Sequence, residues 1–231
     1  MTTVPISPEP VEVRTSTATL PGDVTVPGDA RGLVLFAHGS GSSRHSPRNR
    51  SVAEVLNGAG IATLLFDLLT PEEEAGRANV FDVELLGSRL FDATHWAADQ
   101  PLSRELPLGY FGASTGAAAA IWAAAESGSS IAAVVSRGGR PDLAGDRLSE
   151  VRAPVLLIVG GRDDDVIELN QRAANQLRTE HQLVIVRDAT HVFPEPGALE
   201  AVADLARAWF TDHLVQARGG GPTTSRGTSP S

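Results

Sequence analysis

Short runs of wholly apolar residues alternate with segments of helical periodicity along most of this chain. The run at 33–37 carries no polar residue, which is typical of a strand buried on both faces of a parallel sheet. This alternation predicts an α/β fold, in which a mostly parallel central sheet carries helices on both faces. We predict strands at 33–37, 61–66, 106–111, 131–135, 154–159 and 183–186, and helices at 48–59, 81–98, 117–125, 168–178 and 197–215.

The two ends of the chain follow different patterns. Residues 1–9 are rich in proline and are expected to be loose, whereas 11–20 alternate between apolar and polar residues. The sequence Pro-Gly-Asp at 21–23 predicts a turn into a second short strand at 24–26, and hence an antiparallel start to the sheet. The 231 residues suffice for one domain, which we place at 10–217. The Gly/Ser/Thr/Pro composition of 218–231 predicts a disordered tail.

Composition excludes several classes of function. All 19 basic residues are arginine, so Schiff-base chemistry, pyridoxal attachment and a Walker lysine are excluded. The absence of cysteine excludes thiol nucleophiles, disulfides and thiolate metal sites. A net charge of −9 disfavours nucleic acid and anionic membranes as partners. Because the sequence has neither a secretory signal nor an apolar run near the roughly 20 residues of a membrane span, we expect a cytoplasmic protein.

One segment combines a strand, a tight turn and a helix around a single serine. The apolar run at 106–111 leads into Gly-Ala-Ser-Thr-Gly at 112–116, and an alanine-rich helix follows. A serine nucleophile on a strained strand-to-helix turn needs small neighbours, because strand and helix approach each other closely there. The pentapeptide also arises by chance in chains rich in glycine and alanine. Its context therefore decides whether Ser114 is a nucleophile.

Two later loops supply the side chains that a serine nucleophile needs. His191 follows the last predicted strand and is the candidate base. The loop after the preceding strand offers Asp163, Asp164 and Asp165 as the carboxylate that orients this base. Acyl transfer by serine requires such a base and acid, together with donors for the oxyanion. The chain order serine, aspartate, histidine is the order in which this triad is built on a mostly parallel sheet.

Together these motifs resemble the α/β-hydrolase superfamily, and in size and layout its compact dienelactone-hydrolase-like branch. The resemblance covers about residues 30–215. It rests on four motifs: His-Gly after the first parallel strand at 38–39, the pentapeptide at 112–116, Gly-x-x-Asp-x-x-Val at 160–166, and the late His191.

The resemblance implies a role for each site residue. Asp163 matches the acid, with Asp164 and Asp165 as nearby alternatives, and the backbone N–H groups of Ser40 and Thr115 match the oxyanion hole. His38 is expected to hold in place the loop that begins at 38–39 and carries the Ser40 N–H, which we call the oxyanion loop. Dienelactone hydrolases carry cysteine as the nucleophile, whereas this chain has serine, which favours an ordinary ester as substrate.

Segment 136–153 has room for at most one small helix, where lipases carry a large helical cap. We therefore expect no large cap domain and a shallow, open site suited to small or soluble esters.

Arginines flank the expected site. Arg137 and Arg140 follow the predicted strand at 131–135, and the loop after His38 is followed by three more arginines at positions 44, 48 and 50. One hypothesis is that one or more of these five arginines, with Arg137 and Arg140 as the first candidates, binds a carboxylate or another anion on the substrate, because a guanidinium pairs well with such groups. The alternative is that these side chains are solvated or paired with nearby acids.

The sequence thus predicts a serine esterase with Ser114 as nucleophile, His191 as base and Asp163 as acid, acting on a small-molecule ester without cofactor or metal. A thioesterase or amidase on the same site is the nearest alternative, since acyl chemistry does not fix the leaving group. A hydrolase-like protein that binds a ligand without catalysis is the alternative from another class. The sequence does not indicate an oligomeric state.

Overall fold

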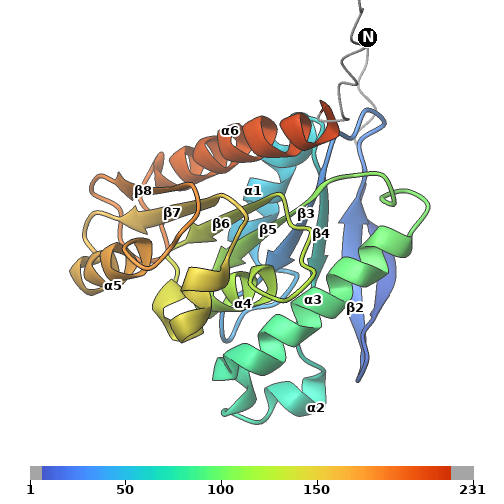
Figure 1. Ribbon diagram of the computed structural model, residues 1–231, viewed down its shortest axis with the longest axis horizontal. Coiled ribbons are helices and arrows are strands. Elements are labelled where there is room, and N and C mark those ends of the chain that lie inside the picture. The colour runs from blue at the N-terminus through green and yellow to red at the C-terminus, as the bar shows by residue number, and fades with distance from the viewer. Residues whose placement is uncertain (1–6, 220–231) are drawn as a thin grey trace, which may run out of the picture.

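A single eight-stranded sheet forms the centre of the protein (Figure 1). The computed structural model describes residues 7–219, with side chains as far as Leu214. Across the sheet the strand order is β1-β2-β4-β3-β5-β6-β7-β8, with β1, β2 and β4 joined by antiparallel pairing and all other neighbours parallel. The mostly parallel sheet predicted from the sequence is confirmed. The strands are β1 (Glu9–Arg14), β2 (Thr19–Thr25), β3 (Leu33–Ala37), β4 (Ala62–Phe66), β5 (Leu108–Ala113), β6 (Ala133–Arg137), β7 (Val155–Gly160) and β8 (His181–Val186).

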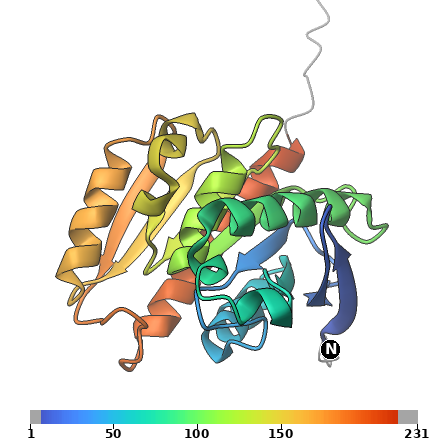
Figure 2. The same ribbon diagram turned by 90° about the horizontal axis from the view of Figure 1, so that it is seen from below.

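Helices cover both faces of this sheet, as predicted. One face carries α1 (Pro47–Gly58) and α6 (Ala198–Gly219), which pack against each other above the sheet in Figure 1. The opposite face is seen in Figure 2. It carries α3 (Val83–Asp99), α4 (Thr115–Ala124), α5 (Asp164–Ala174) and the 3-10 segment η2 (Pro141–Glu150), and the short α2 (Pro71–Glu74) and η1 (Asn79–Phe81) precede α3. Among the residues that the structure describes, no large cap domain covers the sheet edge, as expected.

Two hydrophobic cores, one on each face of the sheet, hold these layers together. Alternate residues of a strand enter opposite cores. In β3, Val34 and Phe36 pack with α1 and α6, whereas Leu33 and Leu35 pack with α3 and α4. Burial on both faces explains why the central strands are continuous apolar runs in the sequence.

The turn predicted at 21–23 is wrong. The chain reverses earlier, at 15–18, where the backbone N–H and the hydroxyl of Thr15 both donate to the carbonyl of Ala18. The Pro-Gly-Asp sequence lies inside β2. A Cβ on Gly22 would stand 3.1 Å from Cβ of Phe66 in β4, so this glycine serves close strand packing and not a turn.

Two predicted segments also differ from the observed ones. The helix expected at 168–178 begins earlier, at Asp164, and its acidic first turn is favourable at a helix N-terminus. The segment 70–77, for which we predict neither a strand nor a helix, contains α2, because Thr70 and Glu73 form a capping box in which each side chain accepts the other's backbone N–H.

The predicted domain limits fall just inside the observed elements. Glu9 already belongs to β1, and α6 continues to Gly219. Most of the predicted loose N-terminus, 1–6, and most of the predicted tail, 220–231, lie outside the described residues. Within 7–219 no helix combines the length and apolarity needed to cross a membrane.

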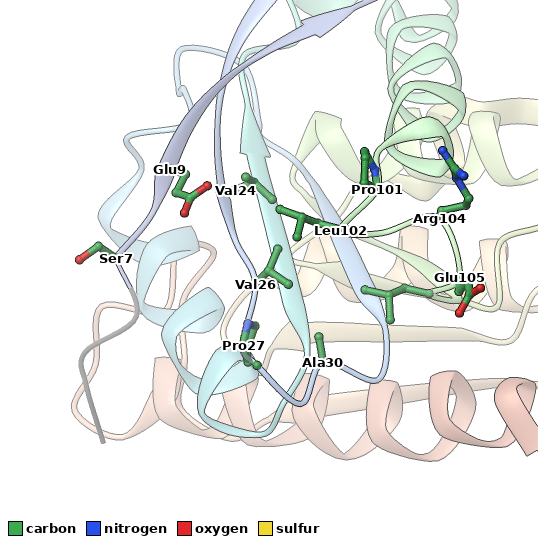
Figure 3. A pocket seen from close by; sticks show the side chains of 12 residues that line it. Ser7, Glu9, Val24, Val26, Pro27, Ala30, Pro101, Leu102, Arg104 and Glu105 are labelled. Atoms are coloured by element: carbon green, nitrogen blue, oxygen red, sulfur yellow. The ribbon is translucent and has the colours of Figure 1, made fainter. Parts of the chain in front are cut away.

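A pocket lies at the edge of the sheet where β3 and β5 begin (Figure 3). Val24 and Val26 line one side, and Leu102, which is 62% exposed, lies on the other. Functional groups of parallel sheets gather where strands end, at the opposite edge. This pocket is therefore remote from the predicted site.

Candidate active site

The Ser114 turn joins β5 directly to α4. Ser114 has φ 51° and ψ −121°, a conformation that is costly for a residue with a Cβ and that is typical of functional sites. Two glycines make the turn possible. A Cβ on Gly112 would stand 2.5 Å from Cα of Ala117, and a Cβ on Gly116 would stand 2.2 Å from the carbonyl oxygen of Ala37. The strand-to-helix turn predicted from the pentapeptide is therefore present.

The loop after β3 lies against this turn. A Cβ on Gly39 would stand 3.0 Å from Cβ of Ser114, so the absence of a side chain allows the close approach. His38 fixes the loop, because its Nε2 accepts the N–H of Leu68 at 3.1 Å and its Nδ1 donates to the carbonyl of Gly39 at 3.0 Å. With both ring nitrogens in backbone hydrogen bonds, His38 has the structural position expected of it.

The two expected oxyanion donors differ in their hydrogen bonding. Thr115 is the first residue of α4, so helix geometry leaves its N–H without an intrahelical acceptor. The N–H of Ser40, in contrast, donates to Oγ1 of Thr115 at 2.8 Å. This contact was not predicted, because the orientation of a threonine hydroxyl leaves no trace in sequence. The Ser40 N–H can bind an oxyanion only if that hydrogen bond is exchanged or shared.

Asp163 and His191 meet across the ends of β7 and β8. Nδ1 of His191 donates to Oδ2 of Asp163 at 2.6 Å, which leaves Nε2 as the remaining ring nitrogen. The Asp163 side chain is 18% exposed and that of His191 is 41% exposed. In the described part of the chain no hydrogen bond joins His191 to Ser114, and such contacts often tighten only when substrate is bound.

Backbone contacts hold the two loops together. The N–H of Arg162 donates to the carbonyl of Ala189 at 2.9 Å, and a Cβ on Gly160 would stand 2.6 Å from that same oxygen. Asp164 and Asp165 lie in the first turn of α5. Of the three candidate carboxylates, the one that reaches His191 is therefore that of Asp163.

A second carboxylate braces the His191 loop. Oε1 of Glu195 accepts the hydroxyl of Thr190 at 2.7 Å, and Oε2 accepts the Thr190 N–H at 3.1 Å. The hydroxyl hydrogen bond holds the pKa of the Glu195 carboxyl below its usual value. Sequence analysis missed Glu195, because a threonine and a glutamate five residues apart in a loop form no distinctive pattern. Phe193 follows with φ 56° and a buried ring, a strained backbone of the kind found at functional sites.

Arg140 is paired with an acid, which was one of the two alternatives. Its Nε and Nη2 donate to the two oxygens of Asp142, both at 2.8 Å, and this pairing raises the pKa of Arg140. Arg44 likewise pairs with Asp67. Neither guanidinium is left without a counter-charge.

Arg137 differs from both. It is the last residue of β6, is 7% exposed, and donates from Nη2 to Oδ1 of Asn49 at 3.2 Å. Burial, with a smaller contribution from Arg48, lowers its pKa to about 10. Arg137 therefore remains protonated at neutral pH.

A small notch adjoins the oxyanion loop. Ser40 and Glu74 line it together with Leu69, Val80 and Leu86, and both leucines are buried. In the segment 7–219, no group of three or more histidine, aspartate or glutamate residues is placed to hold a metal ion.

Comparison with known proteins identifies similar folds. A family model described as an alpha/beta hydrolase domain matches residues 30–204. The crystal structure of a dienelactone hydrolase from Anabaena variabilis is similar with a TM-score of 0.86 and 55% identity, covering 90% of this chain and 99% of that one. Est1E from Butyrivibrio proteoclasticus has a TM-score of 0.75 at 15% identity, covering 89% and 98% of the two chains, a likeness of fold alone.

Similar curated proteins come from Mycobacterium tuberculosis. A putative phosphoribosyl transferase is 63% identical over 219 residues, which are 95% of this chain and 49% of the relative. The chain thus spans about half the length of that relative. An uncharacterized protein of the same organism is 28% identical over 211 residues, covering 81% of this chain and 73% of the relative.

Proposed function

This chain belongs to the α/β-hydrolase domain family, and we propose that it is a serine hydrolase that cleaves small, soluble carboxylic esters through an acyl-enzyme. The observation that carries the proposal is the 2.6 Å hydrogen bond from His191 to Asp163 at the sheet edge where Ser114 occupies its strained turn. A histidine whose Nδ1 is held by a carboxylate is oriented to act as a base through Nε2.

In the proposed mechanism, Oγ of Ser114 attacks the acyl carbon while Nε2 of His191 takes the hydroxyl proton. Asp163 holds the imidazole in the required tautomer and stabilises the imidazolium that forms. The N–H groups of Thr115 and Ser40 stabilise the oxyanion, with the Ser40 N–H released from the Thr115 hydroxyl. His191 returns the proton to the leaving alcohol, and a water activated by the same base then releases the acid.

The size of the substrate follows from the open sheet edge. Among residues 7–219 no large cap domain encloses the site, so a long acyl chain would remain in water. This openness supports small esters and gives no advantage to triglycerides.

The name of the Mycobacterium tuberculosis relative leads to no second proposal. This chain matches 49% of that protein, so the name describes a molecule twice as long. The dienelactone hydrolase from Anabaena variabilis, in contrast, is covered over 99% of its length. Its name describes a hydrolysis, which agrees with the class of reaction proposed here.

The decisive experiment is to label the purified protein with a fluorophosphonate probe and to measure hydrolysis of 4-nitrophenyl esters. We expect labelling of wild type and none of Ser114→Ala. The kcat of that variant should fall by about 10⁴-fold or more, because the three residues act as a unit. Thioesters and amides of the same acyl group, run in parallel, identify the preferred leaving group.

Near-wild-type turnover of esters by Ser114→Ala would contradict the proposal. So would a folded wild-type protein that neither reacts with the probe nor hydrolyses any ester, since that outcome describes a non-catalytic binding protein.

A further inference from the structure

Arg137 is a buried cation without a counter-ion. The residue is 7% exposed, and its guanidinium makes one hydrogen bond, from Nη2 to the neutral side chain of Asn49. Nε is buried and has no acceptor, and Nη1 has none within 7–219. Burying a cation without a charged partner is destabilising, which is why buried arginines are almost always paired.

The surroundings of this guanidinium are positive. Asn49 lies in the first turn of α1, a helix of 12 residues whose N-terminus carries a partial positive charge and whose first turn holds no acidic residue. Arg48 lies in the same turn, is exposed, and forms no ion pair with any described residue. Arg137 thus contacts the N-terminal turn of a helix that also carries Arg48, so an anion bound there would compensate positive charge from both arginines and from the helix.

This positively charged site, made by Arg137, Arg48 and the first turn of α1, lies on the same edge of the sheet as the proposed nucleophile. Arg137 and Ala113 are register partners on neighbouring strands, and the N–H of Ser114 donates to the carbonyl of Arg137 at 3.2 Å. On its other side, Arg137 contacts α1, the helix that follows the oxyanion loop. An anionic group bound here would belong to the far end of a small substrate whose ester carbon is at Ser114.

We propose that Arg137, Arg48 and the first turn of α1 bind a carboxylate carried by the substrate, so that the preferred ester is the half-ester of a short dicarboxylic acid. This inference rests on the proposed function of the Ser114 site. The planar, charged guanidinium suits a carboxylate, whose two oxygens accept parallel hydrogen bonds.

Binding is tested without catalysis by thermal unfolding in glutarate, with sodium chloride at equal ionic strength as the reference. We expect glutarate to raise the Tm of wild type and of Ser114→Ala. It should not raise the Tm of Arg137→Met, which keeps the length of the side chain and removes its charge. Arg178→Met is the matched control, because Arg178 is exposed and lies just before β8 begins, whereas Arg137 lies where β6 ends, so its loss should leave the glutarate effect intact.

Catalysis is tested by the ratio of kcat/KM for 4-nitrophenyl hydrogen glutarate to kcat/KM for 4-nitrophenyl pentanoate, which lacks the charge. We expect wild type to favour the anionic ester and Arg137→Met to lower this ratio at least 10-fold. Arg48→Met should lower it several-fold, and since Arg48 is exposed this second variant keeps the test valid if Arg137→Met does not fold.

The inference is overturned if glutarate does not stabilise wild type, or if the ratio is the same in wild type and in both variants. A larger Tm shift with inorganic phosphate than with glutarate would overturn the choice of a carboxylate. Failure of the proposed function is distinguishable, because glutarate would then stabilise wild type while neither ester is hydrolysed.

Discussion

Two arginines of this protein are both buried and have opposite surroundings. Arg89 in α3 is 2% exposed and donates from Nη2 to Oε1 of Glu73 at 2.6 Å. Arg137 at the end of β6 is 7% exposed, and its one acceptor is the uncharged Asn49. The first has a counter-charge inside the protein, and the second has none among residues 7–219. The comparison separates a cation that the fold uses from a cation that is available to a ligand.

The position of Arg89 explains its structural role. Its carboxylate partner Glu73 belongs to α2, and its Nη1 also reaches the hydroxyl of Thr15 in the hairpin turn at 3.4 Å. One side chain thus ties α3 to two segments that are distant in sequence. Arg137 makes no comparable set of links.

The largest expected effect on stability comes from breaking the ion pair between Arg89 and Glu73. Glu73→Gln keeps the shape of the side chain and its acceptor for the capping box, and it leaves the charge of Arg89 buried and uncompensated. We expect the free energy of unfolding to fall by about 2–4 kcal/mol, measured by urea denaturation at pH 7. Glu72→Gln is the control, since Glu72 is exposed and its substitution should change stability by less than about 0.5 kcal/mol. Equal effects of the two substitutions would remove the distinction between Arg89 and Arg137.

A smaller effect of opposite sign should follow from giving Arg137 the partner that it lacks. Asn49→Asp places a carboxylate oxygen where Oδ1 now accepts from Nη2 at 3.2 Å. We expect a gain of about 1 kcal/mol or more at pH 7 and loss of the glutarate effect on Tm, because the new carboxylate occupies the anion site.

The pH dependence of that gain has a definite sign. The arginine favours the ionised carboxylate, so the folded-state pKa of the new aspartate lies below its unfolded value of about 3.9. The gain is therefore present above about pH 4 and is lost as the pH falls through the folded-state pKa. In an Arg137→Met background the substitution should give no gain. A gain that persists in that background would show that the carboxylate acts on the helix N-terminus and not on Arg137.

The smallest effect is expected for Arg140, which is paired like Arg89 and partly exposed, its side chain being 36% accessible. Arg140→Met should lower the free energy of unfolding by less than about 1 kcal/mol, because water screens the interaction with Asp142. The ratio of anionic to neutral ester kcat/KM should not change. A large fall in that ratio would mean that Arg140 exchanges Asp142 for the substrate.

The sequence was sufficient for the features that depend on burial and on small residues. Continuous apolar runs predicted the parallel strands, because both faces of these strands are covered. The glycines at 112 and 116 predicted the turn at Ser114, because no larger residue fits there. Asp163 could be ranked above its neighbours by resemblance, but its hydrogen bond to His191 became visible only in the structure.

The features that could not be predicted from the sequence depend on contacts between segments that are far apart along the chain. The Pro-Gly-Asp sequence at 21–23 has the composition of a turn, and close packing of Gly22 on β4 decides otherwise. The hydroxyl of Thr115 reaches Ser40, 75 residues away. Likewise, the sequence does not show whether an arginine has a counter-charge. Arg137 and Arg140 were therefore equal candidates for binding an anion, and only the structure distinguishes them.

The contact at Gly116 also governs motion. A Cβ there would stand 2.2 Å from the carbonyl oxygen of Ala37 and 2.5 Å from that of His38, so the main chain of α4 touches the end of β3 and the start of the loop after it with no side chain between them. Side chains at a protein surface change rotamer within picoseconds to nanoseconds, whereas packed main chain moves collectively and far more slowly. We therefore expect the spacing between the Ser114 turn and the Ser40 loop to be insensitive to rotamer exchange.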